Sequence, residues 1–157
     1  MLIIIEGNEG TGKTTLINNL EEHLPFVRLK YSKDVKNIEL LLQFAANSEE
    51  LFVADRSFVT DMVYRIFDGK KGKMSLQSIG TICYSNVKIV MCDNDTGYED
   101  AMKRGEKNIT DKKDYDYITN TFYKIIRLLR SFTNIEIFQY DFHYTSVEEV
   151  VNFIKED

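Results

Sequence analysis

The sequence is poor in the features that mark secreted or membrane-spanning proteins. It holds one proline, Pro25, two cysteines, Cys83 and Cys92, and no tryptophan. The cysteines fit neither a disulfide framework nor a metal-binding spacing, so we expect a reducing, cytoplasmic environment. No apolar run approaches the roughly 20 residues that cross a bilayer, and the apolar start lacks the basic leader of a signal peptide. The sequence therefore predicts a cytoplasmic protein without a membrane partner.

Positive charge is also scarce. Lys and Arg number 20 against 25 Asp and Glu, which gives a formal net charge of −5. Proteins that bind nucleic acid broadly carry a basic surface, so we expect no nucleic-acid partner. Without a proline-rich linker, the 157 residues are expected to form a single domain, 1–157.

The sequence does contain an alternation of strand and helix patterns. Apolar runs predict strands at 2–6, 26–31, 51–55, 87–93 and 134–140. Helical patterns predict helices at 13–23, 35–47, from 57, around Cys83, at 113–132, and after Ser146, which forms a capping box with Glu149. This alternation predicts an α/β fold of three layers, with a central parallel sheet of about five strands flanked by helices. Ligands of such sheets bind at the carboxyl ends of the strands, where Glu6, Asp55 and Asp93 fall.

The most specific motif follows the first predicted strand and reads Gly7-x-x-x-x-Gly12-Lys13-Thr14. In such a loop the backbone amides and the N-terminus of the next helix bind the phosphates of a nucleotide. Lys13 is expected to reach the β- and γ-phosphates, and the hydroxyl of Thr14 to hold Mg²⁺. The motif predicts a P-loop that binds a nucleotide between a buried strand and a helix.

A second polar element ends the strand at 51–55. Asp55 is placed as the second Mg²⁺ ligand, and Arg56 can hold an acceptor phosphate with its fork of donors. A GTPase would carry an Asn-Lys-x-Asp motif after a later strand, and residues 91–97 do not supply one. The sequence therefore favours a phosphotransferase over a GTPase.

These residues resemble the thymidylate kinase family of nucleoside monophosphate kinases and, more distantly, the deoxynucleoside kinases. IEGNEGTGKTT is similar to the thymidylate kinase P-loop, including its acid, Glu9. LLQFAAN resembles the family helix whose phenylalanine, here Phe44, stacks on thymine. DRSFVTDMVYR follows the family pattern with Thr60, Tyr64 and Arg65. KRGEKNITD resembles its lid, expected at about 103–113.

The resemblance implies transfer of the ATP γ-phosphate to a deoxynucleoside 5′-monophosphate, foremost dTMP or a related, modified pyrimidine nucleotide, with ATP and Mg²⁺ as cofactors. The implied catalytic residues are Lys13, Asp55, Arg104 and Glu6, and the metal ligands are Thr14 and Asp55. The implied ATP site comprises Gly7, Asn8, Glu9, Gly10, Thr11, Gly12, Lys13, Thr14, Thr15 and Arg104. The implied acceptor site comprises Glu9, Phe44, Arg56, Thr60, Tyr64 and Arg65.

The lid is assigned the catalytic cation by comparison with the family. One branch of the family carries an arginine within the P-loop, where this sequence has Gly10. The lid must then neutralise the transferring phosphoryl group, and Arg104 is the candidate, with Lys107 and Lys112 behind it. The lid is also expected to be mobile.

The chain departs from the family around the base pocket. The Arg-Glu-Pro stretch after the second strand is replaced by RLKYSKD, and the arginine that follows the FAA helix falls at about Ser48. Our hypothesis is that Arg65 takes over the role of this missing arginine and donates a hydrogen bond to an oxygen of the base. The family forms homodimers through helices next to the sheet, and because one of these is shortened here a homodimer is an open expectation.

Three alternatives remain open. A deoxynucleoside kinase would phosphorylate a 5′-hydroxyl, with Glu6 as the general base. A kinase that acts on nucleic acid would need a positive track, for which only the basic stretch at 68–73 is available. A non-catalytic P-loop protein would not need the basic lid.

Overall fold

The sheet is five-stranded and entirely parallel, and it places the first strand in the middle. The computed structural model describes residues 1–31, 37–70, 74–106, 109 and 111–156. The strand order is β2-β3-β1-β4-β5, with all four neighbouring pairs parallel. The strands are β1 (Leu2–Glu6), β2 (Val27–Lys30), β3 (Phe52–Asp55), β4 (Val87–Cys92) and β5 (Glu136–Tyr140). The predicted parallel sheet of about five strands is confirmed.

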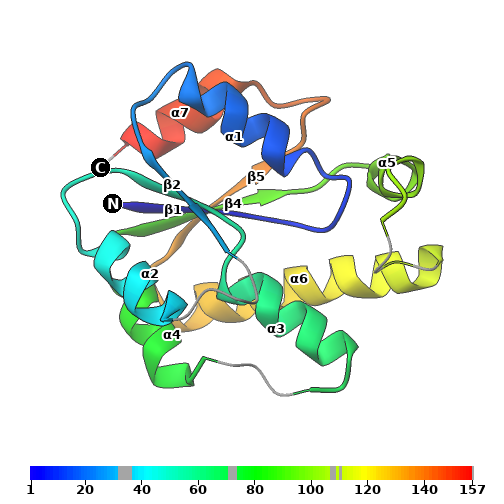
Figure 1. The fold of residues 1–157 in the computed structure, drawn as a ribbon, viewed down its shortest axis with the longest axis horizontal. Coiled ribbons are helices and arrows are strands. Elements are labelled where there is room, and N and C mark those ends of the chain that lie inside the picture. Colours follow the sequence, from blue (N-terminus) through cyan, green and yellow to red (C-terminus); the bar gives the residue numbers. More distant parts are fainter. Residues whose placement is uncertain (32–36, 71–73, 107–108, 110, 157) are drawn as a thin grey trace.

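Helices cover both faces of the sheet (Figure 1). One face carries α1 (Lys13–Glu21) and α7 (Val147–Lys155). The other carries α2 (Ile38–Ala46), α3 (Phe58–Phe67), α4 (Leu76–Cys83) and α6 (Lys112–Phe132). The remaining described helix, α5 (Gly97–Lys103), lies beyond the carboxyl ends of the strands. The three-layer α/β architecture is as predicted.

Most predicted elements appear with trimmed ends. The first helix stops two residues early, at Glu21, and the helix predicted at 35–47 is described from Ile38, because 32–36 lie outside the described residues. Ser146 and Glu149 form the predicted capping box. The sequence did not predict α5, since seven residues with a glycine at the first position show too little periodicity to distinguish a helix from a loop.

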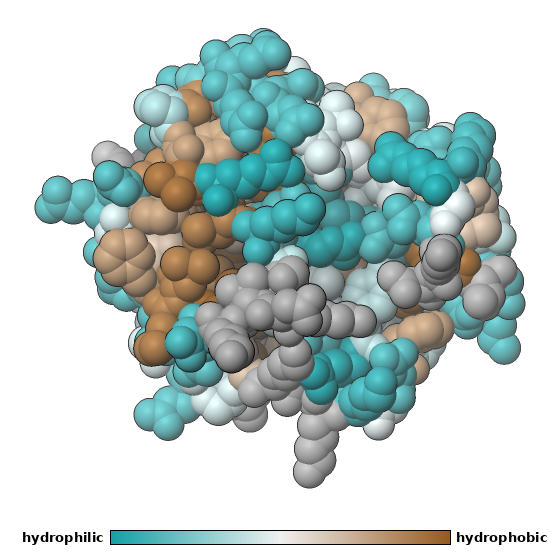
Figure 2. All heavy atoms as spheres, in the orientation of Figure 1, coloured by the Kyte–Doolittle hydropathy of each residue, from teal (hydrophilic) through white to brown (hydrophobic). Residues whose placement is uncertain are grey.

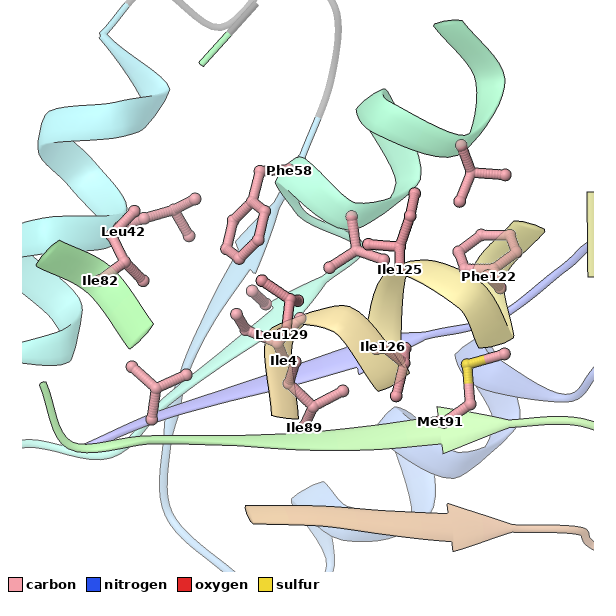
Figure 3. Close-up of a cluster of buried hydrophobic side chains, with 14 of the residues drawn as sticks. Ile4, Leu42, Phe58, Ile82, Ile89, Met91, Phe122, Ile125, Ile126 and Leu129 are labelled. Carbon is pink, nitrogen blue, oxygen red and sulfur yellow. The ribbon is translucent and has the colours of Figure 1, made fainter. Parts of the chain in front are cut away.

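The core lies in two layers, one on each face of the sheet. Figure 3 shows the larger layer, where Ile4, Ile89 and Met91 of the sheet face Phe58 of α3 and Phe122 of α6. The helical stripe predicted in α6, namely Ile118, Phe122, Ile126 and Leu129, is buried there. Burying each such side chain stabilises the fold by about 1.5–3 kcal/mol. This packing holds α3 and α6 against the sheet and so positions the residues at its carboxyl edge.

The surface carries one apolar region that the family resemblance had linked to binding. Figure 2 shows hydrophobic side chains gathering on the side of the molecule where α2 lies. Leu40 and Phe44, one helical turn apart, are 62% and 63% exposed there.

No helix in the described part of the chain combines the length and the apolarity that a membrane span needs.

Candidate functional site

The predicted P-loop connects β1 to α1 and is pressed against two neighbouring segments. Gly7, Gly10 and Gly12 all have positive φ angles, of 139°, 77° and 81°. A Cβ atom on Gly7 would lie 2.1 Å from the carbonyl oxygen of Cys92, and one on Gly10 would lie 2.1 Å from that of Gly97. The loop therefore needs glycine for both backbone conformation and space.

Gly10→Ala is expected to distort the loop rather than merely strain it. A left-handed φ costs an alanine about 1 kcal/mol or more, and the clash with the Gly97 backbone adds to this cost. Gly69→Ala is the matched control, because Gly69 has a φ of 67° and a Cβ added there would meet nothing within 4 Å. We expect the free energy of unfolding in urea to fall by about 1 kcal/mol for Gly69→Ala and by at least about 2 kcal/mol more for Gly10→Ala, with loss of ATP binding. Equal effects would contradict the clash.

Two side chains of the loop are directed to different partners. The amide of Asn8 donates to the carbonyl of Tyr115 at 3.0 Å and to the hydroxyl of Thr119 at 2.8 Å, so it anchors the loop on α6. The ammonium of Lys13 donates to the Asn8 carbonyl and lies 3.4 Å from the Thr11 hydroxyl. Burial, assisted by the charge of Arg56, lowers the pKa of Lys13 to about 8. Lys13 is thus held inside the loop, against the Asn8 carbonyl.

Glu6 ends β1 as a buried carboxylate with both oxygens engaged. Its Oε1 accepts from the Ser57 hydroxyl at 2.5 Å, and its Oε2 accepts from the Thr60 hydroxyl at 2.5 Å. The side chain has no exposed surface. Burial raises the pKa of Glu6, against the effect of the hydrogen bonds from Ser57 and Thr60. The geometry makes Glu6 an anchor for the start of α3.

Arg56 adopts a left-handed backbone conformation, with a φ of 72°, that places its guanidinium beside the P-loop. Its Nη2 lies 2.5 Å from Oε1 of Glu9, and the hydroxyl of Tyr64 donates to the same oxygen at 3.4 Å. Positive φ in a bulky residue is uncommon and is found at functional sites. Three predicted acceptor residues, Glu9, Arg56 and Tyr64, are therefore in contact with one another.

These three residues form one wall of a cavity of about 490 Å³. This volume is in the range of small-molecule sites, about 300–1,000 Å³. Thr60 and Arg65, both predicted, also line it, together with Tyr31, Asp61, Phe67, Asp68 and Lys70. The Nε of Arg65 donates to Oδ1 of Asp61 at 2.9 Å, one turn along α3. Burial raises the pKa of Tyr31 to about 12, so it stays a neutral hydrogen-bonding group.

The two predicted metal ligands lie on the α1 side of the sheet. Thr14 is exposed on the first turn of α1, and Asp55 ends β3 with its side chain 11% exposed. A hydroxyl and a carboxylate suit Mg²⁺, which is commonly held by one or two carboxylates plus substrate phosphates. Within the described residues no three His, Cys, Asp or Glu side chains group as a metal site.

The structure leaves some predicted site residues away from the cavity. Phe44 packs edge-on against Phe52, with ring centroids 5.9 Å apart, and does not line the cavity. Arg104 is exposed at the end of α5. Lys112 lies 5.3 Å from the ring centroid of Tyr98. Lys107 and the rest of 107–108, with residue 110, lie outside the described residues, so the predicted lid is described only in part.

Several residues at the site were missed by sequence reasoning. Phe142, in the loop after β5, would lie 3.0 Å from a Cβ on Gly12, and its ring centroid is 4.1 Å from that of His143. The signal in the sequence was the aromatic run FHY, which begins two residues after the end of β5. Asp61 was signalled by its i,i+4 spacing to Arg65. Arg28, which contacts Asp55, carried no signal.

No protein-family model and no curated protein sequence matches the chain, whereas solved structures do. YorR protein from Bacillus subtilis, in complex with phosphorylated GDP, aligns with a TM-score of 0.70 at 18% identity, covering 98% of this chain and 93% of that chain. Deoxyadenosine kinase from M. mycoides with bound dCTP aligns with a TM-score of 0.62 at 14% identity, covering 98% of both chains. This likeness shows a shared three-layer α/β fold, while the resemblance to thymidylate kinases stays a prediction.

Proposed function

We propose that this protein is a kinase that transfers the γ-phosphate of Mg²⁺–ATP to a deoxynucleoside 5′-monophosphate. The observation that carries the proposal is the position of Arg56, whose guanidinium is held between the P-loop and the acceptor cavity. A guanidinium there can bind the acceptor phosphate bidentately. Lys13 and the helix N-terminus neutralise the donor side, and a cation from the lid adds to them. Thr14 and Asp55 would hold Mg²⁺, which would supply further positive charge to the phosphates.

The state of Glu6 favours a monophosphate over a nucleoside acceptor. A 5′-hydroxyl needs a base within hydrogen-bond reach, whereas a phosphate oxygen is already nucleophilic. Both oxygens of Glu6 are bonded to α3, and the residue does not line the cavity. The nucleoside kinase with Glu6 as base is therefore the weaker alternative. If a nucleoside is the acceptor, Glu9 is the cavity-lining carboxylate that belongs to the P-loop and would take the role of base.

The Arg65–Asp61 pair supports a base that presents a carbonyl beside a ring N–H. Arg65 donates to the carbonyl and Asp61 accepts from the N–H, an arrangement that charge makes stronger than a neutral pair. Thymine and the uracil bases of dUMP and 5-hydroxymethyl-dUMP offer O4 beside N3–H, and guanine offers O6 beside N1–H. This keeps dTMP as the first candidate and adds dGMP. It also replaces Phe44 stacking with polar recognition by α3 as the basis of base binding.

The proposal is tested by ADP release from Mg²⁺–ATP with thymidine, dTMP, dUMP, dCMP, dGMP, dAMP and 5-hydroxymethyl-dUMP as acceptors. We expect turnover on dTMP or a related uracil nucleotide, or on dGMP, and none on dCMP, dAMP or thymidine. Arg65→Gln should lower kcat/KM for the preferred acceptor by about 10- to 100-fold, the scale of a lost charged hydrogen bond, mainly through KM.

The outcomes against the proposal are distinct. Turnover on thymidine alone would identify a nucleoside kinase. If ATP binds but no acceptor of the panel gives ADP release, these free nucleotides are excluded as acceptors, and the end of a nucleic acid is tested next. Unchanged KM values in Arg65→Gln, with Arg127→Gln on the exposed face of α6 as control, would remove Arg65 from base recognition.

A further inference from the structure

Arg28, on the edge strand of the sheet, links the predicted metal ligand Asp55 to the helix that carries the other one, Thr14. Its Nη2 donates to Oδ2 of Asp55 at 2.9 Å, and its Nη1 donates to the side-chain carbonyl of Asn18 on α1 at 3.0 Å. A weaker contact of 3.7 Å joins Nη1 to Glu21. One planar guanidinium therefore connects the end of β3 to the second turn of α1.

The helix geometry extends this connection to Thr14. Residues four apart lie on the same face of an α-helix, with their Cβ atoms about 5–6 Å apart, so Thr14 is on the face of α1 that Asn18 presents to Arg28. Arg28 thereby sets the position of Asp55 relative to the Thr14 face of the helix. We call the Arg28 guanidinium with its two hydrogen bonds, to Asp55 and Asn18, the Arg28 clamp.

The charge of Arg28 acts on the same site. The side chain of Asp55 is 11% exposed and that of Arg28 is 31% exposed, so solvent screens the pair only partly. Arg28 donates to Oδ2 of Asp55, and in the described part of the chain no side chain donates to Oδ1. A guanidinium on Oδ2 fixes the plane of the carboxylate, neutralises its charge, and leaves Oδ1 as the oxygen available to a metal or its water.

We infer that Arg28 is a positioning residue for the divalent cation: it orients Asp55 for the metal that arrives with the nucleotide and weakens binding of a metal that arrives alone. The inference rests on the proposed function, because it requires Asp55 and Thr14 to serve a metal–nucleotide complex. It assigns Arg28, which neither family pattern nor motif had singled out, a role at the reaction centre through Asp55.

The test is Mn²⁺ binding followed by electron paramagnetic resonance, with and without ADP, beside steady-state kinetics. Arg28→Gln should tighten Mn²⁺ binding to the nucleotide-free protein about fivefold or more, because a neighbouring positive charge is removed. Its kcat should fall about tenfold while KM for ATP changes less than about twofold, because the carboxylate loses its orientation. Arg28→Lys, which keeps the charge but not the fork, should show the fall in kcat without the tighter Mn²⁺ binding.

A double-mutant cycle separates this role from a purely structural one. In an Asp55→Asn background, Arg28→Gln should leave Mn²⁺ binding unchanged, because the effect passes through the Asp55 carboxylate. Asn18→Ala, which removes only the hydrogen bond between Arg28 and α1, should lower kcat and leave Mn²⁺ binding to the nucleotide-free protein unaltered. Circular dichroism establishes that each variant is folded.

The inference is overturned if Arg28→Gln leaves Mn²⁺ affinity within twofold of the wild type or weakens it, whatever happens to kcat. Mn²⁺ binding needs no acceptor, so this result stands apart from the acceptor panel. A protein that phosphorylates no nucleotide would lose the proposed function and still report whether Arg28 controls the cation at Asp55.

Discussion

Arg104→Ala is expected to lower kcat by about 100-fold or more, the scale on which phosphoryl-transfer enzymes depend on an arginine that neutralises the transition state. The P-loop position that holds an arginine in one branch of the thymidylate kinases is Gly10 here, and the Gly97 backbone leaves no room for a side chain. Arg104 is exposed at the end of α5, at the start of the predicted lid, and this prediction requires the lid to bring it to the donor phosphates.

Lys103→Ala is the matched control for this prediction. Lys103 is the neighbouring cation, with an exposed side chain that lies 3.5 Å from Asp100, and its removal should change kcat less than about threefold, as expected for a screened surface charge. ATP binding, measured by calorimetry, should survive in both variants. A fall in kcat below tenfold for Arg104→Ala would dismiss Arg104 and move the search to the lysines of the lid.

Lys13 should make activity depend on pH near 8. Burial and the charge of Arg56 lower its pKa to about 8, so the free protein loses the cation as the pH rises through this value. We expect kcat/KM for ATP to fall above about pH 8, while kcat holds to higher pH because bound phosphates keep the lysine protonated. Lys13→Met should lower kcat/KM by about 10³-fold, the loss of a charge aimed at the transferring group.

Lys13→Arg provides the control for the pH dependence. An arginine stays charged across the accessible pH range, so this variant should lose activity through its altered geometry but show no decline of kcat/KM between about pH 7 and 9.5. A wild-type profile that stays flat to about pH 10 would show that Lys13 keeps its proton in the free protein and would contradict the effect of its burial.

The sequence by itself determined the parallel sheet, the P-loop and which residues meet at the carboxyl edge of the sheet. Strand and helix periods are local, so the runs at 2–6 and 51–55 and the stripe of α6 identify their elements without knowledge of their partners. The glycines of the P-loop are equally local, because positive φ angles favour this residue. Arg56 could be placed at the site because it follows a buried strand that ends at the same edge as β1.

The tertiary structure alone decided what those residues contact. Glu6 was predicted at the edge, but its burial and its hydrogen bonds from Ser57 and Thr60 depend on where α3 packs. Phe44 matched a base-stacking pattern, yet α2 directs it to the outer surface, 63% exposed. Arg28 and Asp55 are 27 residues apart in sequence and meet only because β2 and β3 are neighbours in the sheet. Periodicity specifies which face of an element is apolar, whereas the polar contacts of a site follow from how the elements pack against one another, and local patterns carry no record of that packing.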